Sequence, residues 1–471
     1  MKLTRLCGRR DLSDTVISSI CSWLRVKDVK NCRLVSHDWN IAAKPILKQK
    51  SVINLSSKFY ESDIARNERF RRRMASFGQP HHVHIEVSKY SRLHGLTSTN
   101  ELSNVNFFTK FLSPQKLGIT AEISSVLMVQ FLEKILLNSS SNLVQVELGL
   151  DVDDDLIRGD DPLREFFNGA EFPRVKRLDL PFSRVNWSLG KVKVPQIVAA
   201  FPNITELRVD SDLLPVLFVE GGSSPRFLSK LWITGGMSGY KCNAILHLTQ
   251  PLKHLHIEEA FDPSVHHWKP GHDTDISPSL YAVLSKNCHT LEYLDLGLAE
   301  LREDSETWKF PSFPNLKRLN VMKGFYSNDN HAVRFDSEIL NYSETFPKLE
   351  ELQFSPWEGD WTPYFQSFFP AGKHICASVT RLHISDGKEH ANFIEMFRER
   401  DQGKINARFV RILNLFPNAD NLFMQELKSY LVKKGHILKP RSNNNRNRKF
   451  GSQTRAMTKK KMGSSYNFYS L

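Results

Sequence analysis

The sequence is poor in cysteine and places none of its cysteines as a pair. Its 471 residues include six: Cys7, Cys21, Cys32, Cys242, Cys288 and Cys376. No two have the C-x-x-C spacing of a metal finger or a redox motif, and they are too scattered to form a disulfide framework. Single thiols spread through a long chain are typical of reducing compartments, so we expect the protein in the cytoplasm and/or nucleus.

Long hydrophobic runs are also missing. No stretch approaches the roughly 18 uninterrupted apolar residues that a membrane-spanning helix needs. The first residues include Lys2, Arg5, Arg9 and Arg10, but no apolar signal core follows them. The sequence therefore predicts neither secretion nor a membrane partner.

Acidic residues are absent from the C-terminal end. From Leu427 onward the chain has twelve Lys or Arg and no Asp or Glu, while the net charge of the whole chain is +13. The body is therefore nearly neutral, and the positive charge belongs mostly to residues 433–471, which we predict to be a disordered basic tail. Such a tail can serve as a nuclear address or bind nucleic acid weakly. A nuclear nucleic-acid-associated protein is thus one alternative function.

Signatures of catalysis are missing as well. The chain has no phosphate-binding loop, no G-x-G-x-x-G and no G-x-S-x-G. His82 and His84, and likewise His254 and His256, lie two residues apart, as ligands on one strand face do, but no Cys or carboxylate accompanies them at ligand spacing. We therefore predict no catalytic residue, no metal, no cofactor and no enzymatic activity.

What the sequence does contain is the pattern Leu-x-x-Leu-x-Leu, repeated many times and often preceded by Phe-Pro. Clear copies begin at Val175, Ile204, Leu228, Leu252, Leu291, Leu316, Leu349 and Val379, weaker ones at Leu143 and Ala419, and marginal ones at His82 and Pro114. Positions 4 and 6 point to one face of a strand. Helix-like stretches lie between copies, for example after Thr120 and from Ser277 to Cys288. Neither element can bury its apolar face alone, so the repeats predict stacked parallel strands.

This pattern resembles a leucine-rich-repeat array. The steps between successive copies run from 24 to 40 residues, and the Asn or Cys usually found after the last Leu is absent. Ordinary repeats are shorter and more regular, at roughly 20–29 residues. The resemblance implies an α/β fold in which residues 49–432 form an irregular leucine-rich-repeat solenoid, with parallel strands on the concave side and helices outside.

The N-terminal residues have a different pattern. Residues 1–10 are interpreted as a short arm, and residues 11–48 have the spacing of three short helices. Ser13 and Asp14 can cap the first, Asp28 lies at the start of the second, and Ser36 can cap a third that lies before Pro45. Three such helices expose more apolar surface than they can bury among themselves, which favours a partner.

The same stretch resembles an F-box. The matching residues are Leu12, Val16, Ile20, Leu24, Asp28, Leu34, Val35, Ser36 and Trp39. Ser13 stands where the family usually has proline, and Cys21 where it usually has phenylalanine. The resemblance implies that a Skp-family adaptor, and through it a cullin–RING scaffold, is bound by Leu12, Val16, Ile20, Leu24, Leu34, Val35 and Trp39.

An F-box followed by such repeats resembles the substrate-recognition adaptor of a Skp–cullin–F-box ubiquitin ligase, a non-catalytic subunit that holds a protein substrate. The predicted substrate contacts on the concave face are Arg177, Arg208, Trp232, His254, Tyr293, Arg318 and Arg381. Arg177, Glu206 and Lys230 alternate in sign on successive strands, so pairing among themselves is a second interpretation. A repeat scaffold whose F-box does not dock is the other alternative function.

Overall fold

The computed structural model describes the N-terminal helices and the strands that follow them. The described residues are 13–56, 81–87, 114–123, 126–152, 167, 169–181, 194–220, 225–260, 276–298, 307–323, 332–337, 340–355, 367–368, 378–379 and 381–384. The predicted N-terminal arm, Leu12, the copy at Ala419 and the predicted basic tail lie outside these residues.

Three helices open the described chain: α1 (Asp14–Trp23), α2 (Val26–Cys32) and α3 (His37–Lys50). They enclose a small core of their own, made of Ile17, Cys21, Val29, Ala42, Ala43 and Leu47. As predicted, Ser36 caps α3, because its Oγ accepts a hydrogen bond from the Trp39 N–H at 3.3 Å. The helix does not stop before Pro45 but continues to Lys50, past the expected boundary at residue 48. Burial of Leu47 beyond the proline offsets the one backbone bond that the proline removes.

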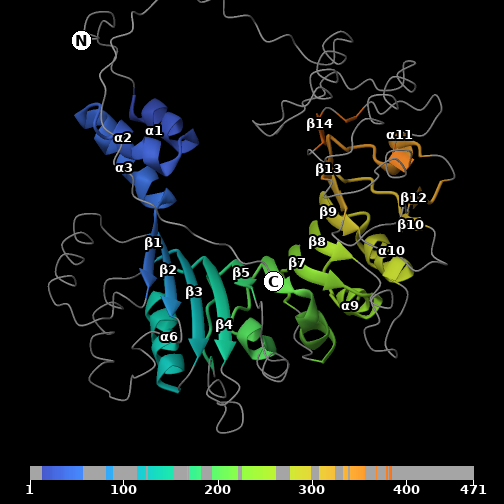
Figure 1. Ribbon diagram of the computed structural model, residues 1–471, viewed down its shortest axis with the longest axis horizontal. Coiled ribbons are helices and arrows are strands. Elements are labelled where there is room, and N and C mark those ends of the chain that lie inside the picture. Colours follow the sequence, from blue (N-terminus) through green and yellow to red (C-terminus); the bar gives the residue numbers. More distant parts are fainter. Residues whose placement is uncertain are drawn as a thin grey trace, which may run out of the picture.

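The rest of the described chain is built on one sheet of twelve strands. In sheet order these are β1 (Val52–Ser56), β2 (His82–Val87), β3 (Lys116–Ile123), β4 (Gln145–Val152), β5 (Arg177–Leu180), β6 (Glu206–Asp210), β7 (Lys230–Met237), β8 (His254–Ala260), β9 (Tyr293–Leu298), β11 (Arg318–Lys323), β13 (Glu351–Ser355) and β14 (Arg381–Ile384). Every pair is parallel. Figure 1 shows the strands following one another along an arc. The chain is therefore α/β with a largely parallel sheet, as the sequence predicted.

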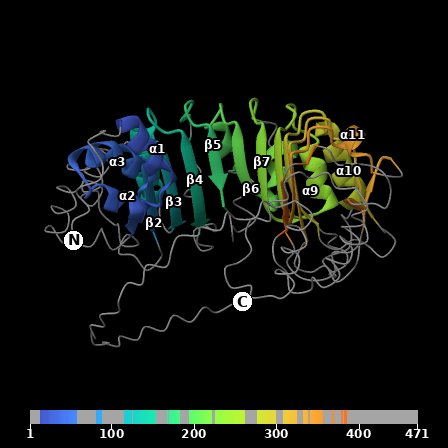
Figure 2. The same cartoon turned by 90° about the horizontal axis from the view of Figure 1, so that it is seen from above.

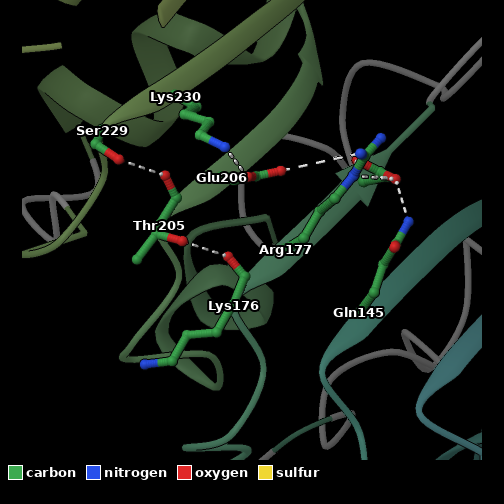
Figure 3. A network of polar contacts seen from close by, with 8 residues as sticks. Gln145, Lys176, Arg177, Thr205, Glu206, Ser229 and Lys230 are labelled. Carbon is green, nitrogen blue, oxygen red and sulfur yellow. Dashed lines mark hydrogen bonds and ion pairs between the residues drawn. The ribbon is translucent and has the colours of Figure 1, made fainter. Parts of the chain in front are cut away.

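The repeated pattern accounts for these strands. Its positions 1, 4 and 6 are buried in each clear copy wherever the side chains are described; Ile204, Leu207 and Val209 are all 0% exposed. The copies also share one backbone arrangement at the start of each strand. The carbonyl oxygen of Lys176 accepts the N–H of Thr205 at 2.8 Å and of Glu206 at 3.0 Å, and the equivalent carbonyls on the neighbouring strands do the same. Figure 3 shows that the Thr205 hydroxyl also donates to that carbonyl.

The two marginal copies form full strands, but one of them was predicted out of register. Pro114 begins a copy whose Leu117 and Ile119 are buried, as expected. His82 pairs with Lys116, which occupies position 3 of its copy, so His82 is position 3 and not position 1. Val83 and Ile85 consequently fill the buried positions of β2.

Helices lie between the strands, and Figure 1 shows α6 (Val126–Ser139), α9 (Gly239–Ile245) and α10 (Ile276–Asn287) on the outer side of the arc. Figure 2 shows α9 and α10 from above, next to one another. The helix predicted to open at Ser277 is α10. The helix expected after Thr120 begins only at Val126, because residues 120–123 extend β3, with Thr120 paired to Gly149.

Several short elements were not predicted from the pattern. A 3-10 turn (Ser211–Leu213) and a π-helical turn (Val216–Glu220) follow β6. A second, two-stranded parallel sheet is formed by β10 (Thr307–Phe310) and β12 (Ala332–Phe335), and α11 (Tyr342–Thr345) precedes β13. Ser277 of α10 donates its hydroxyl to the carbonyl of Thr307 at 3.1 Å, so β10 lies in the helical layer.

Four of the described Phe-Pro pairs stack their aromatic rings two by two in the core. The rings of Phe172 and Phe201 stack at 5.0 Å, and those of Phe313 and Phe346 at 5.9 Å. All four side chains are 0% exposed. Because side chains alternate along a strand, positions 4 and 6 face this core, and positions 3 and 5 face the opposite side of the sheet. We call that opposite side the inner face.

Candidate partner-binding surfaces

The first candidate surface is an apolar stripe on α1. Val16, Ile20 and Trp23 follow one another at i, i+4 and i+7, so they lie on one face of the helix. All three are exposed, and Trp23 is 87% exposed. Ile17 and Cys21 occupy the other face and are buried in the helical core. The helix is therefore apolar on two faces, only one of which the fold covers.

The turn between α2 and α3 adds two more exposed apolar side chains. Leu34 is 85% exposed, and its neighbour Val35 is exposed as well. The turn is held by hydrogen bonds from the Leu34 N–H to Asn31 O at 3.0 Å and from the Val35 N–H to Cys32 O at 3.1 Å. Its backbone is thus fixed while both side chains face solvent.

The predicted docking residues therefore divide into two groups. Val16, Ile20, Leu34 and Val35 are exposed, whereas Leu24 and Trp39 are partly buried and pack on the helical core. Leu12 lies outside the described residues. The exposed residues can contact a partner directly, and the other two hold the helices together.

Two exposed apolar residues were missed because they fall outside the family pattern. Trp23 could have been found from its spacing, since it continues the stripe that Val16 and Ile20 begin. Ile41 of α3 is also exposed. We call Val16, Ile20, Trp23, Leu34 and Val35 the exposed apolar set. Full burial of one such side chain stabilises a complex by about 1.5–3 kcal/mol before the costs of association, so this set can supply much of a binding energy.

The second candidate surface is the inner face of the sheet. The pairing register brings together one row of side chains at position 3: Arg177, Glu206, Lys230, His254, Tyr293, Arg318, Glu351 and Arg381. Arg208 and Trp232 pair with each other in the neighbouring row at position 5. All seven predicted substrate contacts thus lie on this one face.

A chain of polar contacts runs across β4 to β7 (Figure 3). Asp179 accepts hydrogen bonds from Gln145 Nε2 at 3.2 Å and from Arg177 Nε at 3.0 Å. Arg177 also lies 3.9 Å from Glu206, which pairs with Lys230 on the next strand. The alternating charges therefore do pair across the strands, as the second interpretation of the sequence predicted.

An aromatic cluster lies beside this chain. The guanidinium of Arg177 is 5.8 Å from the centre of the Trp232 ring. The Trp232 ring meets His254 edge-on at 6.3 Å, and the His254 and Tyr293 rings lie 4.2 Å apart. Burial, followed by the charge of Lys230, lowers the pKa of His254 below its ordinary value of 6.5. The imidazole is consequently neutral at pH 7, and its contact with Tyr293 is between two uncharged rings.

Further ion pairs extend along the face toward β14. Arg318 lies 3.6 Å from Glu351 and donates to Gln353 Oε1 at 3.1 Å. Arg381 lies 3.2 Å from the same Glu351. Two guanidinium groups from strands on either side thus share one carboxylate.

The described histidines of the two predicted pairs do not gather into a metal site. His256 lies 3.7 Å from Asp295, and His84 lies 3.5 Å from the Thr120 hydroxyl. In the described part of the chain, no group of three or more His, Cys, Asp or Glu is placed to hold a metal ion. Within the same residues, no helix has the length and apolar character needed to cross a membrane.

No family model matches the chain, and no match is found among curated proteins. The functional proposal therefore depends on the residues of this chain alone.

Proposed function

We propose that this protein is the substrate-recognition adaptor of a Skp–cullin–F-box type ubiquitin ligase. The N-terminal helices act as its F-box and bind a Skp-family adaptor, which links the chain to a cullin–RING scaffold. Residues 49–432 act as a leucine-rich-repeat solenoid whose inner face holds a protein substrate. The protein has no catalytic residue of its own in this role.

The observation that carries the proposal is the exposed apolar set. Four of its five members, Val16, Ile20, Leu34 and Val35, occupy F-box positions and are exposed. Two of them lie on a turn whose backbone is hydrogen bonded, so they are exposed by the fold itself. A contiguous exposed apolar patch marks an interaction site, and Val16, Ile20 and Trp23 line one exposed face of α1.

The two departures from the F-box pattern do not argue strongly for a repeat scaffold that fails to dock. Cys21 is 0% exposed and belongs to the helical core, so it alters packing inside the unit and not its exposed surface. Ser13 occupies the N-cap position of α1, where it makes no side-chain capping bond. Neither residue removes a member of the exposed apolar set.

The parallel strands support the second half of the proposal. In the clear copies, positions 1, 4 and 6 are buried wherever the side chains are described, and the same backbone contact to the preceding strand recurs. Stacked repeats of this kind present an extended surface to a partner. Position 3 supplies that surface with one residue from every strand.

Co-expression with the Skp-family adaptor tests the proposal. We expect the full-length protein to recover the adaptor in stoichiometric amount, and the Ile20→Asp, Leu34→Asp double variant to lose at least about nine tenths of it, since each Asp places a charge in an apolar contact. Ile20 and Leu34 are exposed, so both substitutions are compatible with folding.

The matched control is Val219→Asp. Val219 is also an exposed apolar residue, but it lies on the π-helical turn after β6. This variant is expected to recover the adaptor as well as the wild type does. Equal recovery by all three proteins, or recovery by none of them, would rule out adaptor docking through these helices.

A further inference from the structure

The acidic and basic side chains of the inner face differ in how far they reach into solvent. The carboxylates of Asp179, Glu206, Asp295 and Glu351 are between 8% and 25% exposed. The basic groups of Arg177, Lys230, Arg318 and Arg381 are between 33% and 46% exposed. The short acids therefore lie at the floor of the face, and the long cations stand above them, so an approaching partner meets positive charge first.

Arg208 adds a cation that these acids do not neutralise. It is exposed, and it makes no hydrogen bond or ion pair with any residue that the structure describes. Its neighbours across the strands are Asp179, which is already bound by Arg177 and Gln145, and Trp232. A guanidinium beside an aromatic ring can hold a carboxylate in a bidentate pair while the ring covers its apolar side.

The cations form two groups with the aromatic cluster between them. Arg177, Arg208 and Lys230 lie on β5 to β7, and Arg318 and Arg381 lie on β11 and β14. Lys230 and Arg318 are separated by three strand steps in the sheet. At about 4.8 Å per step this is about 14 Å, the length of about four residues of extended peptide. His254 on β8 and Tyr293 on β9 lie in this interval, and Trp232 borders it on β7.

We propose that the inner face from β5 to β14 binds an acidic peptide segment that carries one apolar side chain between two groups of carboxylates. The carboxylates pair with the two cation groups, and the apolar side chain packs on the rings of Trp232, His254 and Tyr293. This inference rests on the proposed function, because it names the class of substrate that the repeats would hold. The acids on the floor limit the net attraction, which favours a peptide with interrupted charge over a nucleic acid with a charge at every step.

Fluorescence anisotropy with the full-length protein and labelled peptides tests the inference. The probe is Glu-Glu-Gly-Phe-Gly-Glu-Glu, and the comparison peptides replace every Glu with Gln or the Phe with Gly. We expect the probe to bind and both comparison peptides to bind at least about tenfold more weakly, since hot spots combine charge pairing with aromatic burial.

Three substitutions in the protein locate the binding. Arg208→Glu is expected to weaken binding of the probe by about tenfold or more, because it reverses a charge that no described residue neutralises. Glu206→Gln is expected to tighten binding, because Lys230 loses its charged partner and Arg177, which keeps Asp179, loses one of its two acidic neighbours. Lys309→Gln is the matched control, since Lys309 is an exposed cation on β10, within the helical layer, and binding should not change.

Other outcomes overturn the inference. An equal affinity of wild type and Arg208→Glu for the probe would place binding elsewhere, including on the basic tail. A labelled oligouridylate that binds more tightly than the probe and loses affinity with Arg208→Glu would make the face a nucleic-acid site. Recovery of the Skp-family adaptor by each variant, measured in parallel, separates a failure of this inference from a failure of the proposed function.

Discussion

A Cβ atom placed on Gly297 of β9 would lie 1.8 Å from the carbonyl oxygen of Glu258 on β8. The two strands change register at this point, between Ile257 and Ala260, so the backbone of β8 bends toward its neighbour. Only a residue without a side chain allows this close approach. The change of register between β8 and β9 therefore depends on a glycine.

Gly297→Ala is expected to destabilise the protein by about 2 kcal/mol or more, since backbone atoms have to move to admit the methyl group. Urea unfolding measures the change. Gly149→Ala is the control: a Cβ there would meet nothing closer than 3.6 Å, so the same substitution fits without displacement. Similar unfolding midpoints for the two variants would show that the backbone at Gly297 does not lie this close to the carbonyl of Glu258.

Phe201→Ala is expected to cost about 3–5 kcal/mol, because a fully buried ring that stacks on Phe172 would leave a cavity. Phe227→Ala removes the same side chain from a site where the ring is 56% exposed and is expected to cost less than about 1 kcal/mol. Chemical denaturation of both variants provides the comparison. A small loss for Phe201→Ala would contradict the role of the Phe-Pro pairs as core residues.

Ser36→Ala is expected to destabilise the helical unit by about 1 kcal/mol, because the capping bond to the Trp39 N–H is lost. Ser13→Ala provides an internal comparison at the N-cap of α1, where no side-chain capping bond is present, and should have a smaller effect. Hydrogen exchange of the α1 and α3 amides distinguishes the two. A larger effect at Ser13 would mean that the caps are assigned to the wrong helix.

The neutral state of His254 predicts a dependence of stability on pH. Its pKa in the folded protein is lowered from 6.5 by burial and by Lys230. The unfolded chain therefore takes up the proton first as the pH falls. The stability that neutral His254 contributes is present in full above the pKa of this group in the unfolded chain. It is lost as the pH falls through the lower pKa of the folded protein.

Substitution of His254 by Gln should therefore reduce the loss of stability between about pH 7 and pH 5, measured as the shift in urea midpoint. Part of the loss should remain, because burial also lowers the pKa of His82. His247→Gln, at an exposed histidine after α9, controls for removal of an imidazole. A steeper pH dependence in His254→Gln than in the wild type would contradict a lowered pKa.

The strands could be predicted from the sequence because burial at positions 1, 4 and 6 leaves a direct trace in residue type. The copy predicted to begin at His82 was placed two residues too late in the sequence. The polar residues His81 and His82 give no sign of which later positions are buried. The extension of β3 beyond Thr120 was missed because these residues are held in a strand by pairing with β4. The local sequence of β3 gives no information about this pairing.

The candidate surfaces were predictable to different degrees. The inner-face residues follow from strand alternation alone, and the register then brings Arg177 and Lys230 to opposite sides of Glu206. The docking residues could not be divided into exposed and packed ones from sequence, because Leu24 and Trp39 have the same apolar character as Leu34. Only the packing of three helices around Cys21 separates them.

Hydrogen exchange of the full-length protein, with and without the Skp-family adaptor, shows whether the N-terminal helices bind that adaptor. We expect slower exchange in α1 and in the turn at Leu34 and Val35 when the adaptor is bound, with no change on the strands of the inner face. Unchanged exchange throughout residues 14–35 at saturating adaptor, or protection confined to the inner face, would contradict this binding.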